Sequence, residues 1–231
     1  KQGIADLGAN NARYAITRNQ EDLFSGDPVA DANKMFDRAV RLGPEFKTQI
    51  DDIAEQLNLK TTLPETAYKT DYYTGTPVGT TKKIPRMVEK ARDKYEGDVT
   101  QLTDPIRTRI VVNTPAEEEA VAKAIGKKFN VFDKGRDIKP EGFVDRKINL
   151  QFTGANGERL VGEVGIITAP MWRASNQGHR MYEDFRALFP KGMPTDPLER
   201  QAINKEVLEK GQVLQDNMKK VFQDAKKQID P

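Results

Sequence analysis

The stretch from residue 80 to residue 112 constrains the fold of this chain more than any other, because it joins an amphipathic helix to a buried strand. Apolar residues recur at helical spacing from Ile84 to Tyr95 and form a single stripe. Pro85 suits the first helical turn, where its missing N–H would have no partner. The turn EGD ends this helix, and the β-branched run RTRIVV predicts a buried strand at 107–113. The helix is therefore expected to pack against a sheet.

Basic residues recur at intervals of four along this helix and flank its apolar stripe. Lys82, Arg86, Lys90 and Lys94 each advance about 40° around the helix axis from the previous one. Packing the stripe against a sheet would hold this row along a cleft, with the Asp104 carboxylate just ahead of the strand. Cations on a fixed helix and a carboxylate at a strand edge suit a metal–polyphosphate ligand. The same spacing also fits a solvated helix face, so spacing alone leaves both interpretations open.

Composition narrows the classes of protein and of functional site that this chain could represent. A chain of 231 residues with 37% hydrophobic and 31% charged residues is long enough for a domain with a real core. A net charge of +2 is too small for a protein-wide nucleic-acid surface, so any basic site is local. The absence of cysteine excludes disulfides, zinc–thiolate sites and a cysteine nucleophile. No apolar stretch approaches the roughly 20 residues of a membrane helix, so we expect no membrane partner. The start at Lys1, without Met or a signal peptide, suggests a processed domain or fragment.

The elements expected around the basic helix make a mixed α/β (α+β) domain, with about five strands in one mixed sheet flanked by helices. In chain order we predict helices at 28–42 and 44–57, the basic helix, a strand at 107–113, a helix at 115–128, a short strand at 129–132, a basic loop, a hairpin of strands at 145–153 and 158–168, a helix after Thr168, and a last helical element at 196–228. The strands at 107–113, 145–153 and 158–168 should be neighbours. The predicted organisation is a linker or arm at 1–25, a catalytic domain at 26–190 and a C-terminal helical extension at 191–231.

The pattern K…R…K…Y.GD…L.D..R, from Lys82 to Arg107, resembles the RelA/SpoT-type synthetases, which transfer pyrophosphate from ATP to the 3′ hydroxyl of a nucleotide. Arg86 stands where the housekeeping enzymes have Ser, which looks more like the toxin and phage-effector branch. The resemblance covers about residues 30–188 and implies a nucleotidyltransferase-like synthetase fold. The ATP phosphate contacts that it implies are Lys82, Arg86, Lys90, Lys94, Arg107 and Arg109.

Glu163, in GEVGIIT, aligns with the Glu of the family's EVQIRT strand. The resemblance implies that Asp104 and Glu163 are the catalytic pair, which binds Mg²⁺ and manages the proton of the acceptor hydroxyl. A Glu that alternates with apolar residues on an antiparallel strand would otherwise simply face water. Gly165 and Ile167 replace the family's Gln and Arg, so the acceptor side must differ in detail.

Two further segments carry the resemblance. Gly142-Phe143 resembles the family's Gly-Tyr, whose ring stacks on the acceptor base, although a lone Phe before a strand is also typical of a core residue. His179 and Tyr182 match the stretch "M…A…H..YE..R", and we expect them to support the cleft. His179 is the only histidine in the chain, and a lone helical histidine is commonly structural, so we do not assign it as the base.

The resemblance implies an ATP:nucleotide 3′-pyrophosphotransferase, or pyrophosphokinase, that works as a toxin or effector. It would act in a cytoplasm, delivered there as part of a secreted or phage-encoded protein, with an immunity or antitoxin protein as a partner. The changes at Gly165 and Ile167 favour an adenine acceptor over guanine. A toxin that pyrophosphorylates tRNA 3′ ends and a noncatalytic nucleotide-binding module remain the alternatives. The paired His-Asp motif of the alarmone hydrolases is missing, which argues against alarmone degradation.

Overall fold

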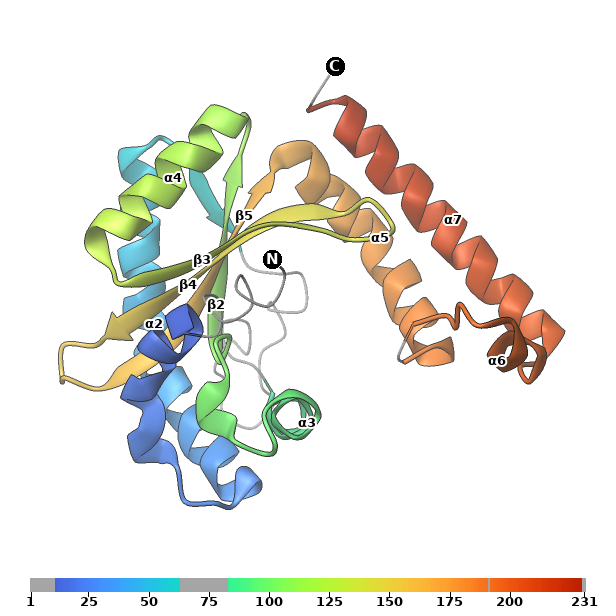
Figure 1. The fold of residues 1–231 in the computed structure, drawn as a ribbon. Helices are drawn as coiled ribbons and strands as arrows, with labels where there is room; N and C mark the ends of the chain where they lie inside the picture. Colours follow the sequence, from blue (N-terminus) through green and yellow to red (C-terminus); the bar gives the residue numbers. More distant parts are fainter. Residues whose placement is uncertain (1–10, 63–82, 191, 230–231) are drawn as a thin grey trace. The chain divides into compact units, whose positions relative to one another are not determined.

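The computed structural model describes residues 11–62, 83–190 and 192–229 (Figure 1). The α-helices include α2 (Pro28–Gln56), α3 (Ile84–Lys94), α4 (Pro115–Lys128), α5 (Ala169–Leu188), α6 (Pro197–Gln201) and α7 (Lys205–Lys227), and the 3-10 helices include η1 (Arg18–Leu23) and η3 (Val99–Gln101). The strands are β1 (Lys60–Thr62), β2 (Ile106–Val112), β3 (Val131–Ile138), β4 (Val144–Thr153) and β5 (Arg159–Thr168). The chain forms two compact units: unit 1 comprises 1–135 and 146–166, and unit 2 comprises 136–145 and 167–231.

The five strands form one sheet in the order β1-β2-β5-β4-β3, which confirms the predicted α/β class. β2, β5 and β4 are neighbours, as the sequence predicted for the strands at 107–113, 158–168 and 145–153. β4 and β5 form the predicted antiparallel hairpin, in which Asn149 pairs with Glu163 and Lys147 pairs with Gly165. β1 lies antiparallel to β2 at the sheet edge.

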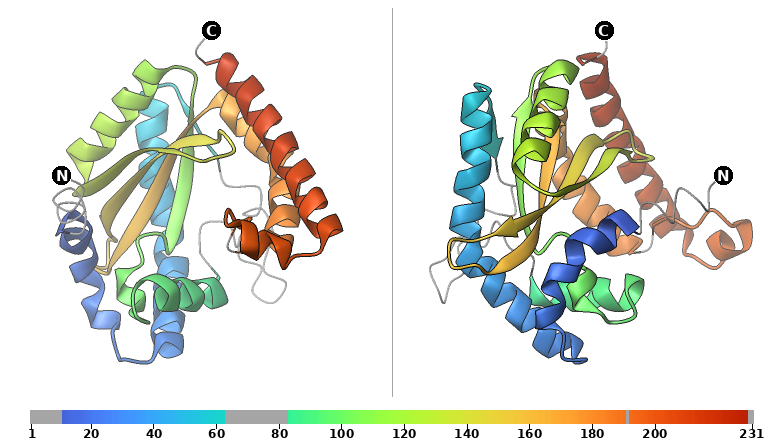
Figure 2. Two further views of the ribbon diagram at one scale, coloured as in Figure 1. Left: turned by 45° about the vertical axis from the view of Figure 1, so that its right-hand side comes forward. Right: turned by 60° about the vertical axis from the view of Figure 1, so that its left-hand side comes forward.

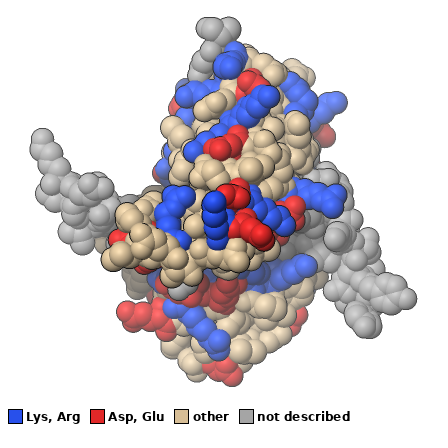
Figure 3. All heavy atoms as spheres, turned by 90° about the vertical axis from the view of Figure 1, so that its right-hand side faces the viewer, with Lys and Arg blue, Asp and Glu red and all other residues tan. Residues whose placement is uncertain are grey.

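Charged side chains do not separate by sign over the surface that Figure 3 shows. Lys and Arg are interspersed with Asp and Glu on this face, in keeping with the small net charge of +2. None of the helices in the described ranges combines the length and the apolar character needed to span a bilayer.

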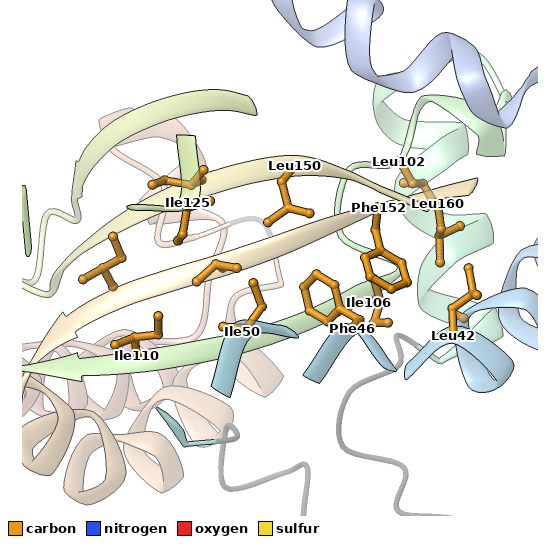
Figure 4. Packing of buried hydrophobic residues seen from close by; sticks show 14 of the residues in the cluster. Leu42, Phe46, Ile50, Leu102, Ile106, Ile110, Ile125, Leu150, Phe152 and Leu160 are labelled. Carbon is orange, nitrogen blue, oxygen red and sulfur yellow. The ribbon is translucent and has the colours of Figure 1, made fainter. Parts of the chain in front are cut away.

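α2 and α4 pack against each other and against β2, and both lie on one face of the sheet (Figure 2). The core between these helices and the strands is fully apolar at its centre, where the rings of Phe46 and Phe152 meet edge to face with centroids 5.5 Å apart (Figure 4). Gly162 on β5 lies under Phe46, and its missing side chain gives that ring its space. β2 and β5 run in the same direction while β4 runs against β5, so the sheet is mixed (Figure 4).

The two helices predicted at 28–42 and 44–57 are one helix, because α2 continues through Pro44. A proline inside a helix costs about 3 kcal/mol. The apolar stripe of α2 keeps its phase on both sides of this proline: Leu42, Phe46 and Ile50 are all buried in the same core. Since burial of each large apolar side chain is worth about 1.5–3 kcal/mol, packing outweighs the cost of the proline.

β3 is longer than the predicted strand at 129–132, and it takes in most of the segment that the sequence suggested as a basic loop. Arg146 on β4 explains the extension, because its Nε donates to Asp133 Oδ2 on β3 at 3.1 Å and its Nη1 donates to Glu119 Oε2 on α4 at 2.7 Å. Burial acts to raise the pKa of the Asp133 carboxyl, but the hydrogen bonds from Arg146 and from the Gly135 N–H, together with the charge of Arg146, outweigh burial and lower that pKa. An ion-pair network across elements gives no periodic signal in the sequence.

The last helical element, predicted at 196–228 as one piece, is two helices, α6 and α7. Asn204 separates them, because its side-chain oxygen accepts a hydrogen bond from the Glu206 N–H at 2.8 Å and so caps a new helix.

The N-terminal segment, suggested as a linker or arm, is packed over its described part. Residues 11–17 are helical and lead into η1, and Ile16 and Leu23 are buried. Gln20 is fully buried: its Nε2 donates to the carbonyls of Thr100 at 2.8 Å and Leu102 at 3.0 Å, and its Oε1 accepts from Val161 N–H at 2.8 Å. This one amide joins the N-terminal segment to η3 and to the start of β5.

Gly162→Ala should destabilise the protein by about 1–3 kcal/mol in a urea unfolding measurement, because the site is already full. A Cβ at Gly162 would lie 2.4 Å from Cε2 and 2.7 Å from Cζ of Phe46, a ring held in turn by Phe152. Gly126→Ala on α4 is the matched control, since its nearest side-chain atom is 3.9 Å away and alanine favours a helix. Equal unfolding midpoints for the two variants would contradict this account of the core.

Candidate active site

One face of the unit 1 sheet packs on α2 and α4, and the opposite face is polar. Consecutive residues of a strand point to opposite faces. Ile106, Ile148 and Gly162 face the core, so their strand neighbours face away from it. The residues that we call the polar face are Arg107 and Arg109 of β2, Lys134 of β3, Lys147 and Asn149 of β4, and Glu163 of β5.

α3 brings one of its cations to this region. Met87, Val88 and Ala91 are buried as the predicted stripe, and the turn after the helix has left-handed conformations at Glu96 and Gly97. Lys90, on the flank of the stripe, donates from Nζ to Asp104 Oδ1 at 2.8 Å. The spacing of the basic helix thus places a lysine on the carboxylate that precedes β2.

The environment of Lys90 couples it to both candidate carboxylates. Burial favours the neutral amine, but the charge of Asp104 and its hydrogen bond, together with smaller contributions from Tyr95 and Glu163, outweigh burial. These interactions raise the pKa of Lys90 above its ordinary value, so this lysine is charged at neutral pH. Lys90, Asp104 and Glu163 therefore belong to one electrostatic cluster.

A second lysine holds the second carboxylate. Lys134 Nζ lies 3.2 Å from Glu163 Oε2 and 3.5 Å from Thr103 Oγ1. Asn149 is fully buried and donates from Nδ2 to the Thr103 carbonyl at 2.9 Å. The residue immediately before Asp104 is therefore fixed by two strands, which places the Asp104 carboxylate relative to Glu163.

Of the predicted phosphate contacts, Arg107 and Arg109 lie on the polar face with Glu163. Arg86 is exposed and forms an ion pair with Glu89 on its own helix, and Lys94 is exposed in the last turn of α3. Lys82 lies outside the described residues. The structure thus brings Lys90, Arg107 and Arg109 to the two carboxylates or to their face of the sheet, while Arg86 and Lys94 extend along the outer surface of α3.

Gly165 explains how Arg109 fits on this face. A Cβ at position 165 would lie 3.2 Å from Arg109 Cγ and 3.6 Å from its Nε, so the glycine gives the arginine room to cross β5. Lys147 is the cross-strand partner of Gly165 on the other side. Where the resembling synthetases carry a Gln, this chain has a glycine whose space the Arg109 side chain takes.

Sequence reasoning did not name Lys134, Lys147 or Asn149 as site residues. The alternation of Ile148, Leu150 and Phe152 could have found the two on β4, because it already places Lys147 and Asn149 on the other face. Lys134 carried no such signal, since its segment was interpreted as a loop.

Phe143, His179 and Tyr182 belong to unit 2. Phe143 is half-buried beside Phe222 of α7, with ring centroids 5.6 Å apart. His179 on α5 is half-buried and Tyr182 is 46% exposed. The roles that the resemblance implied for these three residues stay predictions.

Asp104 and Glu163 suit Mg²⁺ chemically. Their side chains are 12% and 16% exposed, and Mg²⁺ binds hard carboxylate oxygens. No cluster of three or more His, Asp or Glu side chains that could hold a metal occurs among the described residues. An ion here would therefore rely on the two carboxylates plus oxygens of a substrate, the arrangement typical of Mg²⁺ bound with polyphosphate.

No protein-family model matches the sequence, and a comparison with curated proteins finds no match either. Solved structures do match. The Type VI effector Tas1, solved in complex with its immunity protein, is 16% identical over 84% of this chain and 96% of its own, with a TM-score of 0.50. A GTP pyrophosphokinase family protein from Streptococcus pneumoniae is 13% identical over 84% and 91%, with a TM-score of 0.51. The small alarmone synthetase 1 from Bacillus subtilis, bound to its product pppGpp, is 13% identical over 82% and 92%, with a TM-score of 0.50.

The chain has the alarmone-synthetase fold. This confirms the synthetase fold that the pattern from Lys82 to Arg107 implied, and the effector Tas1 shares it. At 13–16% identity this likeness concerns the fold alone.

For the pyrophosphate transfer that the sequence resemblance implies, Asp104→Asn and Glu163→Gln should each lower the rate at least about a hundredfold, because each would remove a negative charge that such a reaction needs. Each change keeps the shape of the side chain but weakens an ion pair with Lys90 or Lys134, so a modest fall in the unfolding temperature is expected as well. Asp133→Asn is the matched control: this carboxylate is also paired with a cation, Arg146, but it faces α4. It should lower the unfolding temperature and keep the activity. Full activity in Asp104→Asn would refute the assignment.

If ATP is the donor that the sequence resemblance implies, Lys90→Met should lower kcat/KM for ATP about ten- to a hundredfold, since a charge-assisted contact to phosphate is worth about 1.5–3 kcal/mol. Lys128→Met is the control, because Lys128 lies on α4 with its Nζ 5.7 Å from the centroid of the Phe129 ring, away from the polar face. Steady-state kinetics with both variants distinguishes a local contact from a diffuse effect of charge, because a diffuse effect would lower kcat/KM equally in the two variants.

Proposed function

We propose that the protein is a pyrophosphokinase that transfers the pyrophosphate of ATP to the 3′ hydroxyl of a purine nucleotide. The observation that carries this proposal is the pair of lysine-held carboxylates in unit 1, Lys90 with Asp104 and Lys134 with Glu163. Two acidic groups among several cations suit a metal–polyphosphate ligand, because cations bind the phosphates and carboxylates bind the metal. The fold shared with a GTP pyrophosphokinase family protein supports the proposal.

The cations of unit 1 would hold the donor. Lys90, Arg107 and Arg109 offer fixed positive charge, and Arg86 and Lys94 extend the row along α3. Transfer of a phosphoryl or pyrophosphoryl group depends mainly on positioning and on the stabilisation of developing charge. Polyphosphate binding would require Lys90 and Lys134 to exchange their carboxylate partners for phosphate oxygens, so the same lysines would neutralise the site before binding and hold ATP afterwards.

The two carboxylates would serve the metal and the acceptor. In the proposed reaction the 3′ oxygen forms a bond to the β-phosphorus of ATP, the bond from that phosphorus to the α–β bridging oxygen breaks, and AMP leaves. Glu163 would accept the proton of the 3′ hydroxyl, and Asp104 with Glu163 would hold Mg²⁺. Bound Mg²⁺ would neutralise negative charge on the polyphosphate.

Phe143 is the proposed platform for the acceptor base, since a phenyl ring stacks on any base. Stacking does not distinguish adenine from guanine. The replacement of the family's Gln and Arg by Gly165 and Ile167 favours an adenine nucleotide. The Bacillus subtilis synthetase was solved with the guanine product pppGpp, so the two acceptors need a direct comparison.

We further propose that the protein works as a toxin or effector in a target cytoplasm and that an immunity or antitoxin protein neutralises it. The shared fold of Tas1, solved with its immunity protein, supports this setting. A tRNA acceptor would need a continuous basic path, and a net charge of only +2 favours a free nucleotide.

The test is to incubate the protein with Mg²⁺, ATP labelled at its terminal phosphates, and separate adenosine nucleotide, guanosine nucleotide and tRNA acceptors. We expect label on the adenosine nucleotide, none without Mg²⁺, and none with Glu163→Gln. Label on guanosine nucleotides or tRNA would overturn the acceptor assignment and keep the reaction class. No transfer to any acceptor would favour a noncatalytic nucleotide-binding module.

A further inference from the structure

Two phenylalanine–glycine contacts join α5 and α7 within unit 2. A Cβ on Gly178 of α5 would lie 3.2 Å from Cζ of Phe222 on α7. A Cβ on Gly211 of α7 would lie 2.3 Å from Cε2 of Phe189, which follows α5. Each ring is buried in the space that the opposite glycine leaves, so the helices approach closely at both places.

The two rings differ in what else they touch. Phe189 packs on Phe185 of α5, the helix that it follows, with ring centroids 5.5 Å apart. Phe222 instead packs on Phe143, with centroids 5.6 Å apart and an angle of 69° between the ring planes. Phe222 is thus the contact through which α7 touches the proposed platform for the acceptor base.

The backbone around Phe143 is held by a tight turn between β3 and β4. The Gly142 N–H donates to the Lys139 carbonyl at 2.8 Å, and the Lys139 N–H donates to the Phe143 carbonyl at 2.9 Å. Gly142 has φ +94°, a left-handed conformation that suits glycine, and its Cβ position lies 3.5 Å from Phe222 Cβ. The turn therefore fixes the Phe143 backbone, and Phe222 packs against both the turn and the ring.

We propose that Phe222 is a positioning residue for the acceptor: it sets the orientation of the Phe143 ring on which the acceptor base stacks. An edge-to-face contact with Phe222 involves at most one face of the Phe143 ring, and Phe143 is only half-buried, so the other face can serve a base. This inference rests on the proposed function. It makes α7, which the sequence suggested as an extension beyond the catalytic domain, a part of the acceptor site.

The test compares Phe222→Leu with Phe189→Leu, two identical changes that each empty a phenylalanine–glycine contact between α5 and α7. Both should lower the unfolding temperature. Only Phe222→Leu should raise the KM for the acceptor. The expected increase is about three- to tenfold, which corresponds to the loss of one aromatic pair. The KM for ATP should stay unchanged in both, and Phe222→Tyr, which keeps the ring, should restore the acceptor KM.

A second readout separates this inference from the proposed function. Calorimetry measures the binding of ADP, and separately of GDP, without turnover. The nucleotide that the wild-type protein binds should bind three- to tenfold more weakly to Phe222→Leu. It should bind to Phe189→Leu with the wild-type affinity. A wild-type protein that binds the nucleotide but transfers nothing would refute the reaction and leave the platform supported by the binding data. Three outcomes would overturn the proposal that Phe222 positions the Phe143 platform. They are no binding of either nucleotide, an unchanged acceptor affinity in Phe222→Leu, and equal losses of affinity in both Leu variants.

If Phe222→Leu does not fold, Gly178→Ala replaces it. The added methyl group displaces the Phe222 ring by a few tenths of an ångström instead of removing it. It should weaken acceptor binding and leave the KM for ATP unchanged, and unchanged acceptor binding in this variant would equally overturn the proposal.

Discussion

The packing of α2 and α4 against one face of the sheet is the constraint on which the rest of unit 1 depends. Phe46 fits over Gly162 and meets Phe152, so alternate strand residues are committed to the core. Because strand side chains alternate, the same commitment presents Arg109, Lys147 and Glu163 on the opposite face. A shift of one residue in the register of β5 would bury Glu163 in the core. The apolar packing thus selects which charged groups meet.

The sequence predicted the elements with strong local signals. The stripe from Ile84 to Tyr95 produced α3, and the alternating run around Leu150 produced the β4–β5 hairpin. Predictions were wrong where distant contacts decided the outcome. Pro44 indicates a helix break locally, but both halves of α2 bury side chains in one core. β3 extends because Arg146 pairs with Asp133, a contact without periodicity.

For the candidate site, spacing and resemblance named Asp104, Glu163 and Lys90, and the structure places these three in one electrostatic cluster. What spacing could not supply was the partner of each carboxylate. The pairing of Lys134 with Glu163 depends on β3 lying beside β4, and the support of Thr103 by Asn149 depends on a residue 46 positions away. Such partners follow from topology, which a single sequence states only indirectly.

Gln20 links the docking of the N-terminal segment to the loop and strand that carry the carboxylates. Its hydrogen bonds span 80, 82 and 141 positions, and contacts of such separation close large loops, which slows their formation. Detachment of the segment would leave the carbonyls of Thr100 and Leu102 and the N–H of Val161 without this partner, at a cost to each group. Folding of this region is therefore expected to be cooperative, and the geometry around Asp104 should arise late, together with the docking of residues 11–23.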